Sequence, residues 1–258
     1  MLDRLQHKLS QAAIRLLIGK ENQQLFHQLD WPMACRQFIT EDLNYPDYYH
    51  KDFHGIKDGY LSPVAPVTYD AITAFASAPN ENWLRQQLIG QIYGHPKQIL
   101  DLGCGTGSST LLLKQAFLDA DVIGLDLSAH MLVMANRKAH SENLEIIWQQ
   151  GLAEATTFPE ASFDLVTASM LFHEMPSEIS QAVIKEAYRL SRPAGQFLVL
   201  DGNQRRLRKT PWLIQLFREP YSQQYATGSV ETWMQQVGFR TSPTHYLGWI
   251  HQINHGQK

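Results

Sequence analysis

Apolar and polar positions change their pattern near residue 98. From there on, short continuous apolar runs alternate with segments of helical spacing. Continuous apolar runs are typical of strands buried on both faces, and their alternation with helices predicts a parallel sheet covered on both sides. The expected strands are 98–102, 121–126, 145–148, 163–169 and 196–201, and the expected helices lie near 108–119, 129–139, 178–191 and 229–237. A hairpin is expected after Gly238, in RTSPTHYL and GWIHQIN.

The N-terminal part has a mainly helical pattern. Apolar residues at helical spacing predict an amphipathic helix over residues 2–17, and a weaker helical stretch follows around 33–43. Residues 44–70 are rich in aromatics, His, Gly and Pro and are expected to be irregular, and helical spacing resumes over 70–93. We therefore expect a helical and irregular N-terminal cap over 1–95 and a core domain over 96–258, with a cap insert at about 203–228.

Composition restricts the function classes. Charged residues are 18% of the 258, and the net charge is -3, which argues against a dedicated nucleic-acid binder. The two cysteines, Cys35 and Cys104, provide no disulfide framework and fit a reducing compartment. The N-terminus lacks the apolar centre of a signal peptide, and no apolar run approaches the ~18 residues of a membrane helix. We expect a cytoplasmic monomer or homodimer without a membrane span.

A glycine-rich loop follows the first expected strand. In QILDLGCGTGSST the glycines are Gly103, Gly105 and Gly107, and Asp101 lies two residues before the first. A strand, a glycine loop and a helix together bind nucleotide-like ligands at the helix N-terminus. The dinucleotide spacing fails because Ser108 stands where the third glycine is needed.

The charge of Asp101 favours one kind of ligand. Two charges ~4 Å apart near a protein surface attract or repel by about 4 kcal/mol. Asp101 therefore disfavours a pyrophosphate and favours a cation. S-adenosylmethionine carries a sulfonium and an ammonium and has no phosphate, so it suits this loop better than a nicotinamide dinucleotide.

The segment LDLGCGTG resembles the first motif of class I S-adenosylmethionine-dependent methyltransferases, and further landmarks match over roughly 96–258. The resemblance implies a Rossmann-like, doubly wound α/β sheet of seven strands whose last strand is antiparallel. It also implies S-adenosyl-L-methionine as the cofactor. The cofactor residues that we infer from it are Asp101, Gly103, Cys104, Gly105, Thr106 and Gly107 in the loop, Asp126, Leu127 and Met131 after the second strand, and Ser169 and Met170 after the fourth.

Two positions bear on how the adenosine is held. Asp126 ends the second expected strand, where the family's acid binds both ribose hydroxyls, and a carboxylate can accept two hydrogen bonds from a cis-diol. After the third strand the family commonly has Gly-Asp-Ala, whereas this chain has Leu152 in place of the acid. Either Glu154 contacts the adenine amine, or the Ala153 backbone and apolar packing hold the ring.

The acceptor is expected beside SMLFHEMP, the segment after the fourth strand. Methyl transfer from a sulfonium is an in-line displacement, so a base is needed only if the acceptor must lose a proton. The candidate catalytic residues are His173 and Glu174, together with Tyr60 and Tyr69. The same segment lacks the Asn/Asp-Pro-Pro-Tyr of enzymes that methylate base amines, and no cysteine beyond 104 supplies a cytosine-type nucleophile.

Aromatic and histidine side chains provide candidate walls for a small organic acceptor. We expect His50 and His54 from the cap and Tyr221 and Tyr225 from the insert to contact it. The spacing of His50 and His54 also suits metal ligands on a helix, but Gly55 and the nearby aromatics oppose this, and we expect no metal site.

The preferred hypothesis is an enzyme that methylates oxygen, carbon or nitrogen of a small molecule. One alternative is an RNA methyltransferase that uses the basic run RRLRK (205–209), although a solvated helix face or a grip on an acidic substrate also explains that run. A second alternative is a non-catalytic protein that binds S-adenosylmethionine. A nicotinamide dehydrogenase is the least favoured.

Overall fold

The computed structural model describes residues 20–76, 80–217 and 219–258. The amphipathic helix expected over residues 2–17 lies outside these ranges. Within them, no helix combines the length and the apolar character that crossing a membrane requires.

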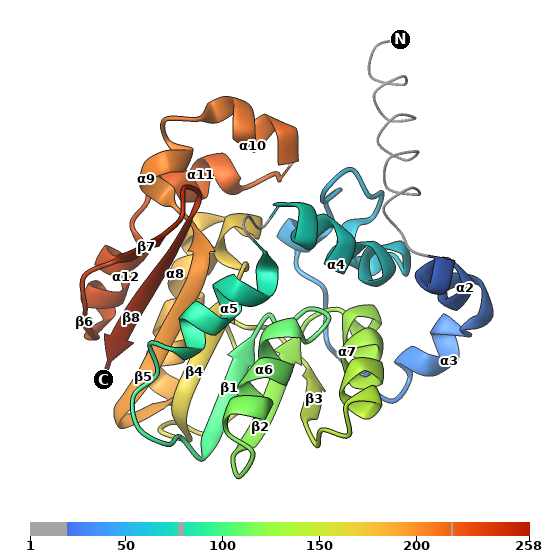
Figure 1. Cartoon of the computed structure of the whole chain (residues 1–258), viewed down its shortest axis with the longest axis horizontal. Helices are drawn as coiled ribbons and strands as arrows, with labels where there is room; N and C mark the ends of the chain where they lie inside the picture. Colours follow the sequence, from blue (N-terminus) through green and yellow to red (C-terminus); the bar gives the residue numbers. More distant parts are fainter. Residues whose placement is uncertain (1–19, 77–79, 218) are drawn as a thin grey trace.

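One mixed sheet forms the centre of the molecule (Figure 1). Its order is β3-β2-β1-β4-β5-β8-β6, and β7 also pairs with β8. Neighbouring strands from β3 to β5 run parallel, and β8 runs antiparallel to β5. The strands are β1 (Gln98–Leu102), β2 (Asp121–Asp126), β3 (Ile147–Gln150), β4 (Phe163–Ser169), β5 (Ser191–Gly202), β6 (Arg240–Thr241), β7 (His245–Leu247) and β8 (His251–Gln257).

The expected Rossmann-like sheet with an antiparallel last strand is confirmed. The two short strands β6 and β7 pair with opposite ends of β8, so together they fill the seventh position of the sheet. The third strand was expected over 145–148 but begins two residues later, at Ile147. The fifth begins at Ser191 instead of 196, with a register shift against β4.

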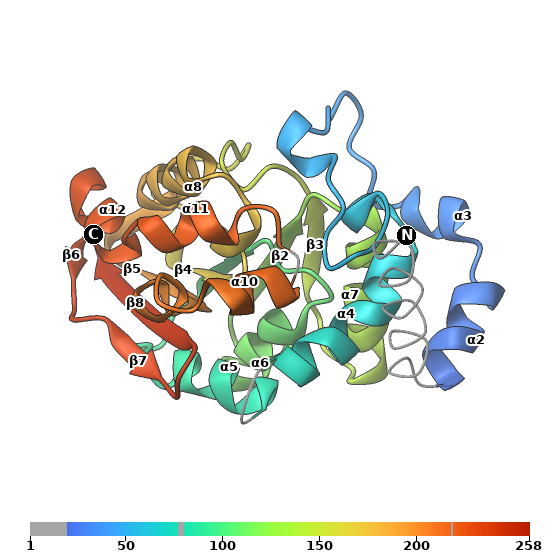
Figure 2. The ribbon, with the colours of Figure 1, turned by 90° about the horizontal axis from the view of Figure 1, so that it is seen from above.

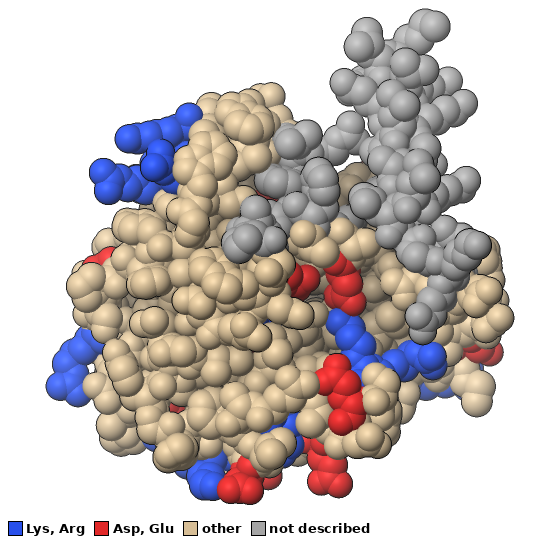
Figure 3. All heavy atoms as spheres, in the orientation of Figure 1, with Lys and Arg blue, Asp and Glu red and all other residues tan. Residues whose placement is uncertain are grey.

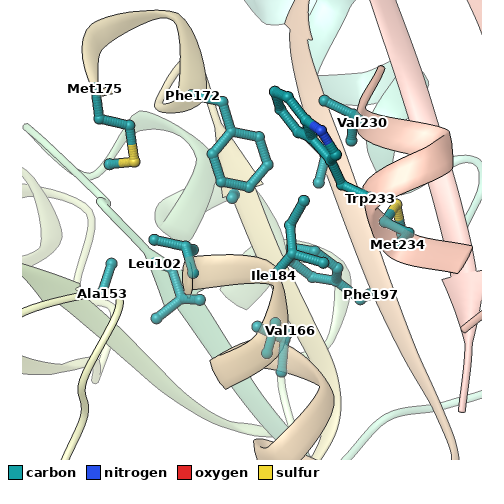
Figure 4. Close-up of a cluster of buried hydrophobic side chains, with 14 of the residues drawn as sticks. Leu102, Ala153, Val166, Phe172, Met175, Ile184, Phe197, Val230, Trp233 and Met234 are labelled. Atoms are coloured by element: carbon teal, nitrogen blue, oxygen red, sulfur yellow. The ribbon is translucent and has the colours of Figure 1, made fainter. Parts of the chain in front are cut away.

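Helices cover both faces of the sheet (Figure 2). Consecutive residues of β1 and β5 point to opposite faces of the sheet and enter different cores, which explains their continuous apolar runs. In β5, Leu198 joins the core beneath α5 (Glu81–Ile89) and α6 (Ser108–Ala116), and Phe197 joins the core on the other face. Figure 4 shows this opposite core, in which Leu102, Val166 and Phe197 lie against side chains of α8 (Ser177–Leu190) and α12 (Val230–Val237). Helix α7 (Ala129–Ser141) follows β2.

The N-terminal segment differs from the expected pattern. The helix expected over 33–43 is instead α3 (Trp31–Cys35), which follows α2 (Lys20–Gln28). Its start is fixed by Asp30, whose Oδ1 accepts a hydrogen bond from Met33 N, and by a proline in its first turn. The expected irregular segment contains the 3₁₀ turns η1 (Asp47–Tyr49) and η2 (Gly59–Leu61). It also contains the first half of α4 (Val64–Ala76), whose apolar side chains pack on α7 and so outweigh weak local propensity.

Helix α5 belongs to the layer that covers the sheet, although it lies within the expected cap. Leu84 and Leu88 are buried against Ile99 of β1, Leu113 of α6 and Leu198 of β5. The proposed division between cap and core at residue 95 remains a prediction, with α5 as the helix through which the N-terminal segment joins the sheet.

We predict that Leu84→Ala lowers the free energy of unfolding by about 2–5 kcal/mol, because it leaves a cavity in this core. Urea unfolding followed by circular dichroism measures the change. Leu118→Ala is the control, since Leu118 is 66% exposed and its truncation should change stability by less than about 0.5 kcal/mol. Equal effects of both variants would contradict the packing of α5 on the sheet.

Candidate active site

A pocket opens at the carboxyl end of the parallel strands, beneath the N-terminal segment, and its empty volume is about 660 Å³. One side is formed by the glycine loop and the ends of β2 and β4, and the other by aromatic residues of the cap. The sequence-predicted residues that line it are Tyr60, Tyr69, Gly103, Gly105, Asp126, Leu127, Met131, Leu152, Ala153, Glu154, Met170 and Glu174. The fold thus brings together residues that the sequence assigned to the cofactor and to the acceptor.

The glycine loop adopts a backbone that only glycine accommodates easily. Gly103 has φ +64° and Gly107 has φ +82°, both in the left-handed region. A Cβ at Gly103 would lie 2.5 Å from Leu171, and one at Gly107 would lie 2.8 Å from Trp148. At Gly105 a Cβ would meet only Tyr69, at 3.8 Å, so this glycine leaves the backbone open to the pocket.

Asp126 is held rigidly at the end of β2. One carboxylate oxygen accepts a hydrogen bond from Gly105 N at 2.8 Å, and the other accepts one from Ser128 N at 2.8 Å. Burial raises the pKa of Asp126 to about 6, although these two backbone hydrogen bonds act in the opposite direction. Each oxygen keeps a second lone pair, so the carboxylate can still accept from two ribose hydroxyls.

Asp101 lies deeper than the sequence argument assumed. Its side chain is 1% exposed, and its oxygens accept hydrogen bonds from Thr110 Oγ1 at 2.6 Å and Thr167 Oγ1 at 2.7 Å. Burial raises the pKa of Asp101, opposed by these hydroxyls and by the charge of Arg85. Its negative charge therefore acts mainly on a small second pocket that it lines.

The second pocket contains groups of both signs. Arg85 of α5 lines it opposite Asp101, and Arg85 also bonds to Glu81 and Ser109. Ser169 lines it as well, and its buried hydroxyl has no hydrogen-bond partner in the structure as described. A site with a cation, an anion and a spare hydroxyl suits a zwitterionic amino-acid group such as the methionine part of the cofactor.

The residues expected to hold the adenine leave the same two possibilities that the sequence left. Leu152, Ala153 and Glu154 all line the larger pocket, so the apolar contact and the carboxylate are both available. Glu154 Oε1 accepts a hydrogen bond from Tyr48 OH at 2.6 Å, which ties the cap to this segment. Whether Glu154 binds the adenine amine remains a prediction.

Glu174 is the carboxylate at the acceptor end of the larger pocket. Its Oε1 accepts a hydrogen bond from Tyr60 OH at 2.5 Å and lies 3.1 Å from His54 Nε2. Burial raises the pKa of Tyr60 well above its ordinary value, so the phenol keeps its proton and donates it. Burial lowers the pKa of His54, but the hydrogen bond to Glu174 and the charges of Glu174 and Glu219 together outweigh this, and the net shift is upward. Both neighbours thus hold the side chain of Glu174 in place through the same oxygen.

His173 lies behind this surface and is not among the residues that line the larger pocket. Its Nδ1 is 2.6 Å from Asp201 Oδ1, and its Nε2 is 3.5 Å from Glu219 and 3.8 Å from Glu174. Burial lowers the pKa of His173, but the charges of Asp201 and Glu219 outweigh it and hold the pKa well above its usual range. These charges favour the protonated form of His173, and an imidazolium has no lone pair to act as a base.

Asp201 explains why Glu174 faces the pocket. Its Oδ2 accepts hydrogen bonds from Leu171 N at 3.1 Å and Phe172 N at 2.8 Å, which fixes the turn η3 (Phe172–Glu174). Just before this turn, Met170 has φ +54°, an unusual backbone for a residue with a side chain. Such a strained position beside a pocket is typical of functional sites.

Several predicted residues lie outside the larger pocket. Tyr225 is fully buried, and its hydroxyl donates to Gly202 O, so it is a core residue and does not reach the acceptor space. Tyr221 supports the wall from behind, since its hydroxyl donates to Tyr48 O. His50 is exposed on the cap surface. Thr106 lines only the second pocket and bonds to Asp70.

Cys104 also lines the second pocket and is 8% exposed. Burial raises the pKa of its thiol well above the ordinary value, so it is not a nucleophile. Among the described residues, no group of three or more His, Cys, Asp or Glu side chains is arranged to hold a metal ion.

Tyr48, Arg85 and Glu219 are among the site residues that were not found from the sequence. Arg85 had a usable signal, because it follows Glu81 by one helical turn on the apolar face of its helix, where a charge requires a partner. Tyr48 and Glu219 reach the site only through contacts with residues more than 40 positions away, and no local pattern marks them.

The fold and the site together define an α/β protein that binds an adenosine-type ligand at the carboxyl edge of its sheet. Comparison with known sequences narrows this class. A family described as "Methyltransferase domain" matches residues 99–195. The demethylmenaquinone methyltransferase of Lactiplantibacillus plantarum is 31% identical over 179 residues, which cover 65% of this chain and 74% of that protein. An uncharacterized methyltransferase of Synechocystis is 31% identical over 166 residues, 61% of this chain and 74% of the relative.

Other matches are shorter or concern the fold alone. The demethylmenaquinone methyltransferase of Thermus thermophilus is 34% identical over 142 residues, which cover 55% of this chain and 63% of that protein. The match to the demethylmenaquinone methyltransferase of Lactobacillus johnsonii covers 62% of that protein. Among solved structures, a SAM-dependent methyltransferase of Aquifex aeolicus has a TM-score of 0.56 at 18% identity, over 73% of this chain and 97% of that one. The [4+2]-cyclase SpnF has a TM-score of 0.57 at 17% identity, over 69% and 80%.

The chain belongs to the class I S-adenosylmethionine-dependent methyltransferases. The family inferred from LDLGCGTG is therefore confirmed, and with it the expected cofactor, S-adenosyl-L-methionine. The residues present suit this cofactor, since Asp126 is free to accept from a ribose and the second pocket offers charges for an amino acid. The individual cofactor contacts remain predictions.

We predict that the affinity for S-adenosylmethionine falls as the pH drops through about 6. The ribose hydroxyls donate to the Asp126 carboxylate, and protonation of a group with a pKa of about 6 removes that acceptor. Each pH unit below this value should raise the Kd by up to about tenfold. Titration calorimetry across this range measures the effect.

Asp126→Asn provides the control for this pH dependence. It keeps the shape but cannot ionise, so it should bind the cofactor at least about tenfold more weakly above the pKa, with a Kd that changes little with pH. A wild-type Kd that is constant through pH 6 would show that the Asp126 carboxylate does not contact the cofactor.

Proposed function

We propose that the protein transfers a methyl group from S-adenosylmethionine to a small, largely apolar acceptor that carries an acidic proton, with Glu174 as the base. The observation that carries the proposal is the composition of the larger pocket. In one space it holds the glycine loop and Asp126 for the cofactor, aromatic and apolar walls, and the carboxylates of Glu154 and Glu174.

The walls favour a planar or apolar molecule. Tyr48, Tyr49 and Phe53 line the pocket from the cap, and Met170 and Met175 line it from the core. Aromatic faces and flexible methionine side chains suit a ring compound, which they bind through apolar contact. The same pocket must also hold the cofactor, so the acceptor occupies the part that the cofactor leaves free.

Glu174 is better placed than His173 to take a proton. Glu174 lines the pocket, whereas His173 is enclosed by Asp201, Glu219 and Glu174, whose charges favour its protonated form. Tyr60 and His54 both bond to Oε1 of Glu174, and within the described part of the chain Oε2 has no hydrogen-bond partner. Oε2 is therefore the oxygen that accepts the acceptor's proton.

The reaction follows from this arrangement. The cofactor supplies an activated methyl group, and the pocket holds the acceptor atom in line with it. Glu174 removes the proton from a phenol or carbon acid as the new bond to the methyl carbon forms, and S-adenosylhomocysteine leaves. His54 and Tyr60 are then positioned to stabilise the carboxyl group between turnovers. Neighbours that donate to Oε1 alone keep the other oxygen directed at the acceptor.

The acceptor class is also suggested by relatives whose names contain demethylmenaquinone. Demethylmenaquinone is therefore the acceptor to test, together with simple substituted phenols. Labelled methyl transfer from S-adenosylmethionine to an extractable product measures the activity. If the wild-type protein binds the cofactor but labels no member of this panel, the proposed acceptor class is wrong.

We predict that Glu174→Gln lowers kcat by about 10²–10⁴-fold, because the amide cannot accept the proton. The Kd for S-adenosylmethionine should change less than about threefold, since Glu174 lies at the acceptor end and both neighbours can still bond to the amide. Initial rates at saturating cofactor and calorimetric binding separate the two quantities.

His173→Gln is the matched comparison. Its side chain can still donate to Asp201, so it should lower kcat at least about tenfold less than Glu174→Gln does. A larger loss for His173→Gln than for Glu174→Gln would show that His173, the other candidate from the sequence, is the base.

A further inference from the structure

A basic surface lies at the carboxyl edge of the sheet, outside the pocket. It consists of Arg205, Arg206, Arg208 and Lys209, which belong to α9 (Gln204–Leu207) and the two residues after it. All four are exposed, and none forms an ion pair within the part of the chain that the structure describes. Basic side chains gather at the upper left of Figure 3, over the place that α9 occupies in Figure 1. This surface is positive although the whole chain has a net charge of -3.

Two exposed tryptophans accompany the basic surface. Trp212 in the first turn of α10 (Pro211–Phe217) is 58% exposed, and Trp249 in the β7–β8 turn is 48% exposed. The β7–β8 turn is tied to the start of α9, since Asn203 N donates to Ile250 O at 2.7 Å. Exposed indole rings beside arginines are typical of segments that lie at the interface between water and lipid headgroups.

The same segment forms part of the active-site wall. After α10 the chain supplies Glu219, which lies 3.5 Å from His173, and Tyr221, which bonds to Tyr48 at the start of the cap. It then forms α11 (Ser222–Thr227), which packs against η3. The basic surface and the acceptor pocket therefore lie on the same side of the sheet and are joined by one short segment.

We propose that residues 203–213 and the β7–β8 turn dock on an anionic membrane surface, with the four basic residues on lipid headgroups and Trp212 and Trp249 at the acyl boundary. The complementary charge is the phosphate of an acidic lipid. The reason for docking rests on the proposed function, because an apolar acceptor partitions into the bilayer and must be collected there. The docking itself is independent of turnover.

The geometry favours a membrane over RNA. The four basic residues lie within five positions, which is a short cluster, whereas a nucleic-acid strand is bound along an extended basic groove. A flat contact in which the indoles enter an apolar layer uses both features of the surface.

Flotation of the full-length protein with vesicles tests the proposal. Vesicles of phosphatidylcholine and phosphatidylglycerol in equal amounts should bind it, vesicles of phosphatidylcholine alone should bind at least tenfold more weakly, and added salt should release it. Arg205→Gln/Arg206→Gln/Lys209→Gln should lower the partition coefficient at least tenfold, since each basic residue near an anionic surface contributes roughly fivefold. Trp212→Ala should weaken binding in a way that salt does not alter.

A triple variant with the same loss of charge elsewhere is the control. Lys97→Gln/Lys185→Gln/Arg240→Gln removes three exposed cations from other elements and should bind vesicles like the wild type. Equal binding by the Arg205/Arg206/Lys209 variant, or no binding of the wild type to anionic vesicles, overturns the proposal. A third outcome also overturns the proposal: the wild type binds a single-stranded RNA oligonucleotide but no vesicles, and the Arg205/Arg206/Lys209 variant loses the RNA binding. That outcome would assign the surface to RNA. Because binding is read without an acceptor, its failure is distinct from failure of the methyl-transfer proposal.

Discussion

Buried carboxylates at the ends of the central strands organise this site. Asp101, Asp126 and Asp201 end or nearly end β1, β2 and β5, and each is at most 9% exposed. A buried carboxylate is costly unless hydrogen bonds satisfy it, so each one fixes the groups around it. Asp101 holds hydroxyls of α6 and β4, Asp126 holds amides of the glycine loop and of the α7 cap, and Asp201 holds the turn that carries Glu174. The strand ends thereby become a rigid platform on which cofactor and base take fixed positions.

The cap completes this platform through polar contacts as well as apolar packing. Tyr60 and His54 reach Glu174, and Tyr48 reaches Glu154, so both ends of the pocket depend on hydrogen bonds from the N-terminal segment. Ser128 Oγ also donates to Tyr60 O, which links the cap to the same residue whose amide holds Asp126. The positions of Asp126 and Glu174 are therefore linked through a few short contacts between cap and core.

The insert after β5 connects this chemistry to the surface of the molecule. Its start carries arginines and an exposed tryptophan, and its end supplies Glu219 beside His173. A segment of fewer than twenty residues therefore joins the basic surface to the wall of the pocket.

The sequence by itself determined the features that depend on local order: the strand, glycine loop and helix, and the acid at the end of β2. Apolar runs and glycine spacing specify these through the backbone of neighbouring residues, which explains why β1, β2 and β4 began and ended where expected. Only the tertiary structure decided that His173 is enclosed by carboxylates, that Tyr225 is a core residue, that Asp101 is turned inward, and that Glu219 lies beside His173. These outcomes depend on burial and on charges far apart in the chain, such as Tyr60 and Glu174 at a separation of 114 residues. A one-dimensional pattern does not encode which of several ionisable groups are brought into contact, and that contact is what sets their protonation and their role.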